Sequence, residues 1–94
     1  MRVVPTALPE VLVIEPVVHR DARGFFLETY HVQKYRDAGI SAPFVQDNHS
    51  RSGAGTLRGL HAQLGRRPQG KLIHTLQGVI FDVAVDVQIG RAHV

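Results

Sequence analysis

The strictest pattern in this sequence is the alternation over residues 79–87, VIFDVAVDV. Its odd-numbered positions are all apolar: Val79, Phe81, Val83, Val85 and Val87. The positions between them hold Ile80, Asp82, Ala84 and Asp86. A period of two places alternate side chains on opposite faces of a β-strand. The segment therefore predicts a strand with one aliphatic face, which must be covered by other strands.

Further short runs of strand-forming residues are separated by Gly, Pro, Asn and Asp, which favour turns. The expected strands, besides 79–87, cover residues 11–16, 24–30, 42–50, 56–63 and 71–77. Residues 31–39 predict one or two helical turns that end at Gly39, while 51–55 and 64–70 predict a turn and a loop. Five or six short strands with one short helix predict an all-β sandwich or barrel.

Composition bounds the class of protein. The chain has 94 residues, of which 44% are hydrophobic and 20% charged, as expected for one small soluble domain. No apolar run approaches the roughly 20 residues that span a bilayer, and the N-terminus has no signal-peptide core. The chain has no Cys, which excludes disulfides and thiolate chemistry. We therefore expect a cytoplasmic protein that does not contact a membrane.

The formal charge is +3, and nine of the eleven Lys and Arg residues are Arg. No basic run exceeds two residues, so the sequence does not predict a clustered basic face for nucleic acid. A planar guanidinium group suits carboxylates and phosphates, which it can bind through two parallel hydrogen bonds. An anionic small molecule explains the charge at least as well as nucleic acid does.

The segment TLRGLHAQ, residues 56–63, places polar groups within an expected strand. His61 could act as a general base, because imidazole exchanges protons near neutral pH, or it could be a half-buried structural histidine. Strict alternation would put Arg58 and His61 on opposite faces. Gly59 could form a bulge that redirects one of them, or Arg58 could serve a neighbouring subunit. The residues alone leave these alternatives open.

Two other segments concentrate polar groups. In FVQDNHS, three polar residues follow one another, Gln46, Asp47 and Asn48, and they either end a strand in an Asx-type turn or line a site. In RDARGFFLE, Arg23 could bind an anion and Glu28 follows on the expected strand. A surface loop that leads into a hairpin is the alternative for this second segment.

The interval from Gly55 to His61 resembles the first signature of the cupin superfamily. Metal-binding cupins have a second histidine where this chain has Gln63, followed by a glutamate. No Glu follows Gln63 anywhere in this chain, so a three-ligand site cannot be assembled from the motif. We therefore expect no metal and no cofactor.

Five segments together resemble the dTDP-4-dehydrorhamnose 3,5-epimerase family. DARGFFLETY, FVQDNHSRS, LRGLHAQ, QGKLIH and GVIFDVAVDV occur in the order and approximate spacing of that family, over nearly all of residues 1–88. The resemblance implies a cupin-type jelly-roll barrel, a homodimer and no catalytic metal. It also implies conversion of dTDP-4-dehydro-6-deoxy-D-glucose to dTDP-4-dehydro-L-rhamnose, on the pathway to dTDP-L-rhamnose.

The resemblance also implies roles for individual residues. It makes His61 the base that removes a proton beside the ketone of the sugar, and Lys71 the cation that stabilises the resulting enolate. Arg23 and Arg58 match positions that contact the substrate, where cations meet its diphosphate. The pocket for the nucleotide and sugar would be formed by Glu28, Gln46, Asp47 and Asn48.

The resemblance further implies a chain longer than this one. The general acid of the family, a tyrosine, and the aspartate that orients its histidine would both lie beyond position 94. We therefore expect residues 1–88 to be the N-terminal part of one jelly-roll domain, which is incomplete here. Residues 89–94, IGRAHV, fit neither a strand nor a turn and equal the translation of a common short-read sequencing adapter before a stop codon, so we expect a non-native tail.

Two alternatives to this function stay open. One is a sister dTDP-sugar 3- or 5-epimerase or ketoisomerase on the same fold, because these enzymes share the segments above. The other is a non-catalytic fragment that binds sugar nucleotides, because the chain keeps the residues expected to bind anions. A retained His61 favours an enzyme over a binding module.

Overall fold

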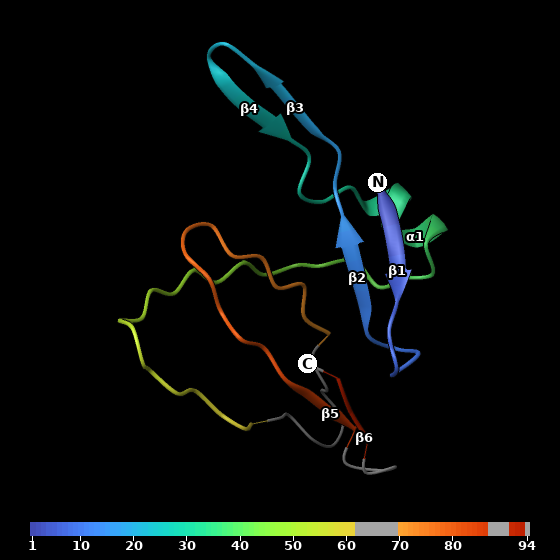
Figure 1. Ribbon diagram of the computed structural model, residues 1–94. Coiled ribbons are helices and arrows are strands. Elements are labelled where there is room, and N and C mark those ends of the chain that lie inside the picture. Colours follow the sequence, from blue (N-terminus) through green and yellow to red (C-terminus); the bar gives the residue numbers. More distant parts are fainter. Residues whose placement is uncertain (62–69, 87–90, 94) are drawn as a thin grey trace.

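The computed structural model describes residues 1–61, 70–86 and 91–93. Within these ranges the chain forms three two-stranded antiparallel sheets and one short helix (Figure 1). The pairs are β1 (Arg2–Pro5) with β2 (Leu12–Glu15), β3 (Val18–Asp21) with β4 (Gly24–Leu27), and β5 (Ala84–Asp86) with β6 (Arg91–His93). The helix α1 spans Val32–Asp37.

The β1–β2 sheet forms between two segments rich in Val and Ile, residues that favour strands. Its register places Val3 opposite Ile14. The Thr6 hydroxyl donates to the Val11 carbonyl oxygen at 2.6 Å and so closes the connection between the strands. Leu8, within that connection, is only 4% exposed.

The β3–β4 hairpin is set by its turn. Asp21 and Gly24 are the last paired residues, so only two residues connect the strands. Gly24 has φ +140°, a conformation that glycine adopts without the strain a Cβ would cause. Phe25 and Phe26 point to opposite faces and are 67% and 70% exposed, so both faces of the hairpin are largely open.

The helix α1 carries the best-packed side chain of the described residues. His31 caps its N-terminus, because the backbone N–H of Lys34 donates to His31 Nδ1 at 3.3 Å. Tyr35 is 3% exposed, and its ring meets that of Tyr30 edge-on at 4.8 Å between centroids. Tyr30 in turn contacts Phe44 edge-on at 5.3 Å. This aromatic cluster, Tyr30, Tyr35 and Phe44, ties the helix to the segment that follows it.

Three expected elements are confirmed. The strand expected at 11–16 is β2, the strand expected at 24–30 is the shorter β4, and the helical turns expected within 31–39 are α1. A turn also forms at 54–55, inside the expected turn 51–55. The strands β1 and β3 were not predicted.

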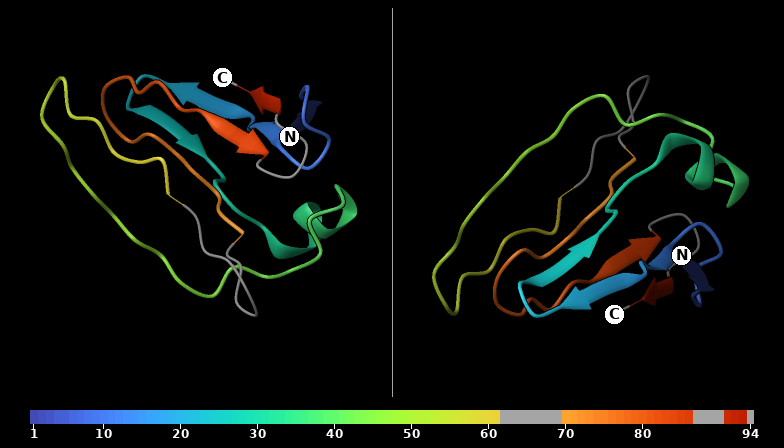
Figure 2. Two further views of the ribbon diagram at one scale, coloured as in Figure 1. Left: turned by 90° about the horizontal axis from the view of Figure 1, so that it is seen from below. Right: turned by 90° about the horizontal axis from the view of Figure 1, so that it is seen from above.

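Several expected strands are wrong in the described residues. Residues 42–50, 56–61 and 71–77 form no strand, and of 79–86 only 84–86 does. Figures 1 and 2 show residues 42–61 as a long extended trace that leads away from α1 and then turns back. A strand needs a neighbour for its N–H and C=O groups, and these described segments have no paired strand beside them.

The expectation that the tail forms neither strand nor turn is wrong for residues 91–93, which pair with β5 as β6. Residues 62–63 of the expected fourth strand, 64–69 of the expected loop and Val87 of the last expected strand lie outside the described residues.

The described elements are mostly strands with one six-residue helix, which confirms the all-β class. These elements do not close into a barrel, and no helix among them is long and apolar enough to cross a membrane.

Candidate functional site

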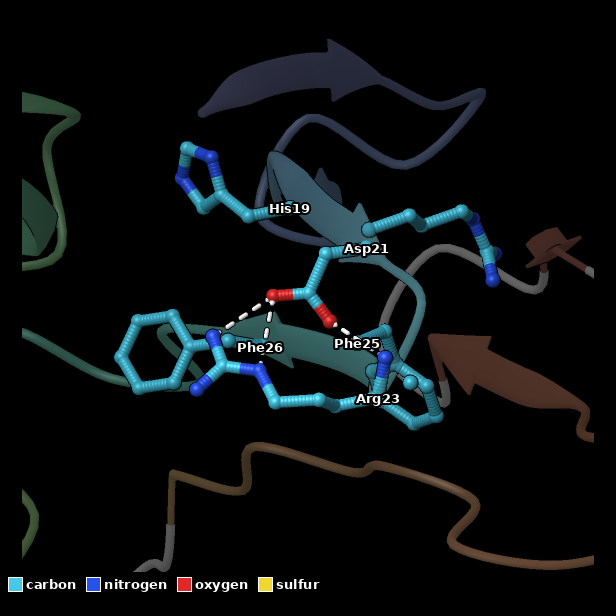
Figure 3. A pocket seen from close by; sticks show the side chains of 7 residues that line it. His19, Asp21, Arg23, Phe25 and Phe26 are labelled. Atoms are coloured by element: carbon cyan, nitrogen blue, oxygen red, sulfur yellow. Dashed lines mark hydrogen bonds and ion pairs between the residues drawn. The ribbon is translucent and has the colours of Figure 1, made fainter.

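The turn of the β3–β4 hairpin positions Arg23, the first of the expected site residues. Its backbone N–H donates to Asp21 Oδ1 at 2.8 Å, while its Nη2 and Nε donate to Asp21 Oδ2 at 2.7 and 3.2 Å (Figure 3). The side chain of Arg23 is 91% exposed and that of Asp21 51%. Hydrogen bonds from the side chain and then the backbone of Arg23 lower the pKa of Asp21.

Arg23 also borders a surface hollow of about 430 Å³ on this hairpin (Figure 3). The hollow is lined by His19, Arg20, Asp21, Arg23, Gly24, Phe25 and Phe26. Arg20 and Phe25 are paired across the hairpin on the face opposite to His19 and Phe26. The Arg20 guanidinium carbon lies 5.8 Å from the centre of the Phe25 ring, a distance at which a cation and an aromatic face attract each other. Guanidinium groups beside aromatic rings can bind an anion that carries a flat ring.

Glu28 lies just after β4, against the helix. Its Oε1 accepts a hydrogen bond from Lys34 Nζ at 2.9 Å, and this bond lowers the pKa of Glu28. The backbone at Thr29, the residue after Glu28, is also held by α1, because Tyr35 Oη donates to the Thr29 carbonyl oxygen at 2.9 Å. Burial raises the pKa of Tyr35, so its hydroxyl keeps its proton as a donor.

Glu28 borders a second hollow, of about 260 Å³, between β3, β4 and α1. This hollow is lined by Met1, Pro16, Val17, His19, Phe26, Glu28, Tyr30, Lys34 and Tyr35. His19 and Phe26 line both hollows, so Arg23 and Glu28 belong to neighbouring parts of one hairpin surface. The described structure thus brings these two expected site residues into one region.

The three polar residues at 46–48 lie on the extended segment beyond α1. Gln46 Nε2 donates to Asn48 Oδ1 at 3.1 Å, and all three residues, including Asp47, are exposed. Among the described residues, no hydrogen bond or ion pair joins them to Arg23 or Glu28. They form a local polar cluster rather than part of the hairpin surface.

Arg58, His61 and Lys71 are exposed on segments without regular secondary structure. Neither of the two hollows described above includes any of the three. Gly59 has φ +108°, so the chain does not continue as an extended strand from Arg58 to His61. The alternation argument therefore fails at Gly59, and the described structure does not assemble the expected base with the expected enolate cation.

Two residues of the site were missed from the sequence. Asp21 could have been found, because Asp two residues before Arg-Gly is typical of a turn closed by an Asx side chain. Lys34 could not, because its contact to Glu28 spans six residues and crosses from strand to helix, where no single periodicity applies.

The described residues contain no cluster of three His, Cys, Asp or Glu side chains that could bind a metal, while Gln63 lies outside them.

Comparison with known proteins identifies the relatives of the chain. The family model described as dTDP-4-dehydrorhamnose 3,5-epimerase matches residues 5–93. A Salmonella typhimurium protein with that name is 51% identical over 89 residues, which cover 94% of this chain and 49% of the relative. A Pseudomonas aeruginosa protein of the same name is 50% identical over 91 residues, covering 96% of this chain and 50% of the relative.

A more distant relative has a different name. A Streptomyces niveus protein named dTDP-4-dehydrorhamnose 3-epimerase is 36% identical over 91 residues, which cover 96% of this chain and 44% of that protein. The chain therefore spans about half the length of the relatives it matches. No solved structure matches the chain significantly.

Proposed function

The chain belongs to the dTDP-4-dehydrorhamnose 3,5-epimerase family, and we propose that the whole protein, meaning the product of the complete gene that contains this sequence, catalyses the reaction that names the family. It converts dTDP-4-dehydro-6-deoxy-D-glucose to dTDP-4-dehydro-L-rhamnose. The observation that carries this proposal is the 51% and 50% identity, over nearly the whole chain, to two relatives with that name. The 3-epimerase relative is less similar, at 36%.

The chemistry assigned to this chain centres on His61. Its imidazole removes a proton from each of the two carbons beside the ketone of the sugar in turn, which leaves negative charge on the ketone oxygen until a proton is returned on the opposite face. The ammonium group of Lys71 stabilises that enolate, an effect typically worth roughly 100-fold in rate for one well-placed donor. Exposure of both residues in the described structure leaves them accessible to a substrate and to the rest of the protein.

The remaining residues bind the substrate without reacting. Arg23 and Arg58 bind the diphosphate, and the outward exposure of the Arg23 side chain supports this role. The nucleotide and sugar lie against Glu28, Gln46, Asp47 and Asn48. This chain requires no metal or cofactor for these steps, because the base, the enolate cation and the anion ligands are all side chains.

The proposal extends to the architecture of the whole protein. Residues 1–88 form the N-terminal part of one cupin-type jelly-roll domain, which acts as a homodimer in the cytoplasm, while 89–94 are a non-native tail. The half-length match to the relatives supports a longer protein. Sequencing the genomic locus tests the tail: codons for Ile-Gly-Arg-Ala-His-Val followed by a stop would refute it.

Replacing the proposed base tests the function. In the whole protein, His61→Ala should abolish epimerisation while dTDP binding stays within about tenfold, because a base contributes to the transition state rather than to ground-state binding. The matched control is His74→Ala, which removes another exposed imidazole and should leave turnover unchanged. Turnover by His61→Ala near the wild-type rate would refute the assignment.

A further inference from the structure

Asp21 has no part in the proposed chemistry, yet it accepts three hydrogen bonds from Arg23. The backbone N–H of Arg23 donates to Oδ1, and one edge of the guanidinium group donates to Oδ2 through Nε and Nη2 (Figure 3). The first bond closes the hairpin turn. The other two hold the guanidinium group of the same residue back against that turn.

Two donors on one oxygen fix the orientation of the guanidinium plane as well as its position. The contacts occupy Nε–H and one N–H of Nη2, which leaves the two N–H groups of Nη1 and the second of Nη2 free to bind an anion. The side chain remains 91% exposed, so these groups are accessible. A tethered arginine has already lost part of the rotamer entropy that a free one would lose on binding.

We propose that Asp21 is a positioning residue, which holds the Arg23 guanidinium group in the orientation that binds the diphosphate of the substrate. This inference rests on the proposed function, because the anion is that of a dTDP-sugar. Asp21 is ionised at neutral pH, since the hydrogen bonds from Arg23 lower its pKa. The tether is therefore present under the conditions of binding.

The negative charge of Asp21 also repels a diphosphate, so the two effects must be compared. Asp21 and Arg23 are both at least half exposed, and water and salt screen charge interactions between such groups. The hydrogen bonds act at 2.7 and 3.2 Å, where screening is weakest, whereas an anion on the free N–H groups lies across the guanidinium group from the carboxylate. We therefore expect positioning to outweigh repulsion, so that removing the carboxylate weakens the binding of dTDP.

Calorimetric titration of the whole protein with dTDP and with thymidine tests this inference. Asp21→Asn keeps an oxygen acceptor for the turn but loses the charge, and should weaken dTDP binding about 2–5-fold. Asp21→Ala also loses the turn bond and should weaken it about 5–10-fold. Thymidine binding should be unchanged in both, because thymidine has no phosphate. General damage to the fold would weaken both ligands.

The matched control is Glu15→Gln. Glu15 is an exposed carboxylate on β2 that lies 3.5 Å from Arg2 and makes no contact with Arg23, so this variant removes the same charge without the tether. It should bind dTDP as the wild type does. In a protein that already carries Arg23→Ala, Asp21→Asn should cause no further loss.

The inference is overturned if Asp21→Asn binds dTDP as tightly as the wild type, or more tightly. It is also overturned if thymidine binding falls by the same factor as dTDP binding. Unchanged dTDP binding by Arg23→Ala alone would refute both the diphosphate role of Arg23 and the role of Asp21. The proposed function is tested separately, by comparing the epimerisation rates of the wild-type protein and His61→Ala.

Discussion

Glu28 and Lys34 show how a contact between single residues joins two elements of the described structure. Glu28 follows β4, and Lys34 lies on α1. Their ion pair, at 2.9 Å, is about half exposed on both sides, so solvent screens much of its strength. Its clearest effect is on protonation, because the hydrogen bond from Lys34 lowers the pKa of Glu28.

Replacing Lys34 should therefore change how Glu28 titrates. In Lys34→Met, the pKa of Glu28 should rise toward its ordinary value of 4.5, as measured by carboxyl NMR of the whole protein. Because the folded-state pKa is lowered, the stability from the pair is present above the unfolded pKa and is lost as the pH falls through the folded one. The melting temperatures of wild type and variant should differ at neutral pH and converge in acid.

The control for this titration is Arg36→Met, which removes another cation from α1. Arg36 makes no ion pair with a described residue, so its loss should leave the pKa of Glu28 near the wild-type value. Identical titration of Glu28 in wild type and Lys34→Met would contradict the account of this pair.

At the scale of single residues, the sequence predicts which side chains could bind a ligand or take part in a reaction, but not which other residues they contact. Arg23 and Glu28 were both identified from the sequence, and the structure places them on one hairpin surface. Their partners are set by a turn and by a helix that folds back, and neither is encoded as spacing along the chain. The roles of His61 and Lys71 stay predictions, because these residues depend on parts of the fold that the described residues do not form.

Among the elements, those with strong local signals were predicted. The Val- and Ile-rich run of β2, the aromatic run of β4 and the Gly39 stop after α1 all act over a few residues. β3 was missed because its sequence, VHRD, is mainly polar, and its pairing comes from the turn that it shares with β4. The expected strands at 42–50 and 71–77 need distant partners, which local pattern cannot supply.

Tyr35 should be the residue on which α1 depends most. Its buried ring packs on Tyr30, and its hydroxyl donates to the Thr29 carbonyl oxygen. Tyr35→Ala should lower the free energy of unfolding by roughly 3 kcal/mol or more, because it removes a buried aromatic ring. Tyr35→Phe, which loses only the hydrogen bond, should lower it by about 1 kcal/mol. Urea unfolding of the whole protein measures both changes.

A surface position on the same helix provides the comparison for Tyr35. Gln33 is exposed and bonds only to Asp37 within the helix, at 2.9 Å. Gln33→Ala should change the free energy of unfolding by less than about 0.5 kcal/mol. Equal effects of Gln33→Ala and Tyr35→Ala would show that the aromatic cluster does not stabilise α1.

For the molecule as a whole, the exposed surface is too large for a compact domain. The chain exposes 8832 Å², whereas a compact monomer of this mass exposes about 5400 Å². Its radius of gyration is 15.2 Å, against about 12 Å for a compact domain of this length. Val45, Leu57 and Val79 are each more than nine-tenths exposed. An apolar surface of this kind is expected where further chain packs in a larger fold.

The 94-residue chain expressed alone should therefore behave as a partly folded molecule. It should bind a hydrophobic dye such as ANS, show no cooperative thermal transition and aggregate through its open strand edges. The whole protein should bind little dye and unfold cooperatively. A sharp thermal transition of the isolated chain, without dye binding, would contradict the proposed incomplete jelly roll.

The all-β class was predicted correctly at this scale, because short runs of strand-forming residues separated by Gly and Pro can be read directly from the sequence. The jelly roll stays a prediction, since barrel closure depends on pairing between strands far apart in the chain. The aliphatic face at 79–87 illustrates the difference. Its period of two is plain in the sequence, yet Val79 and Phe81 are 97% and 81% exposed, because no described layer covers them.

The most direct measurement of the central claim follows the sugar of dTDP-4-dehydro-6-deoxy-D-glucose by NMR, with the whole protein in deuterated water. A 3,5-epimerase that works by proton abstraction should place solvent deuterium at both carbon 3 and carbon 5 of the product, and His61→Ala should place it at neither. Deuterium at a single carbon would assign the protein to a single-site epimerase instead. No incorporation by the wild-type protein, or full incorporation by His61→Ala, would contradict the account.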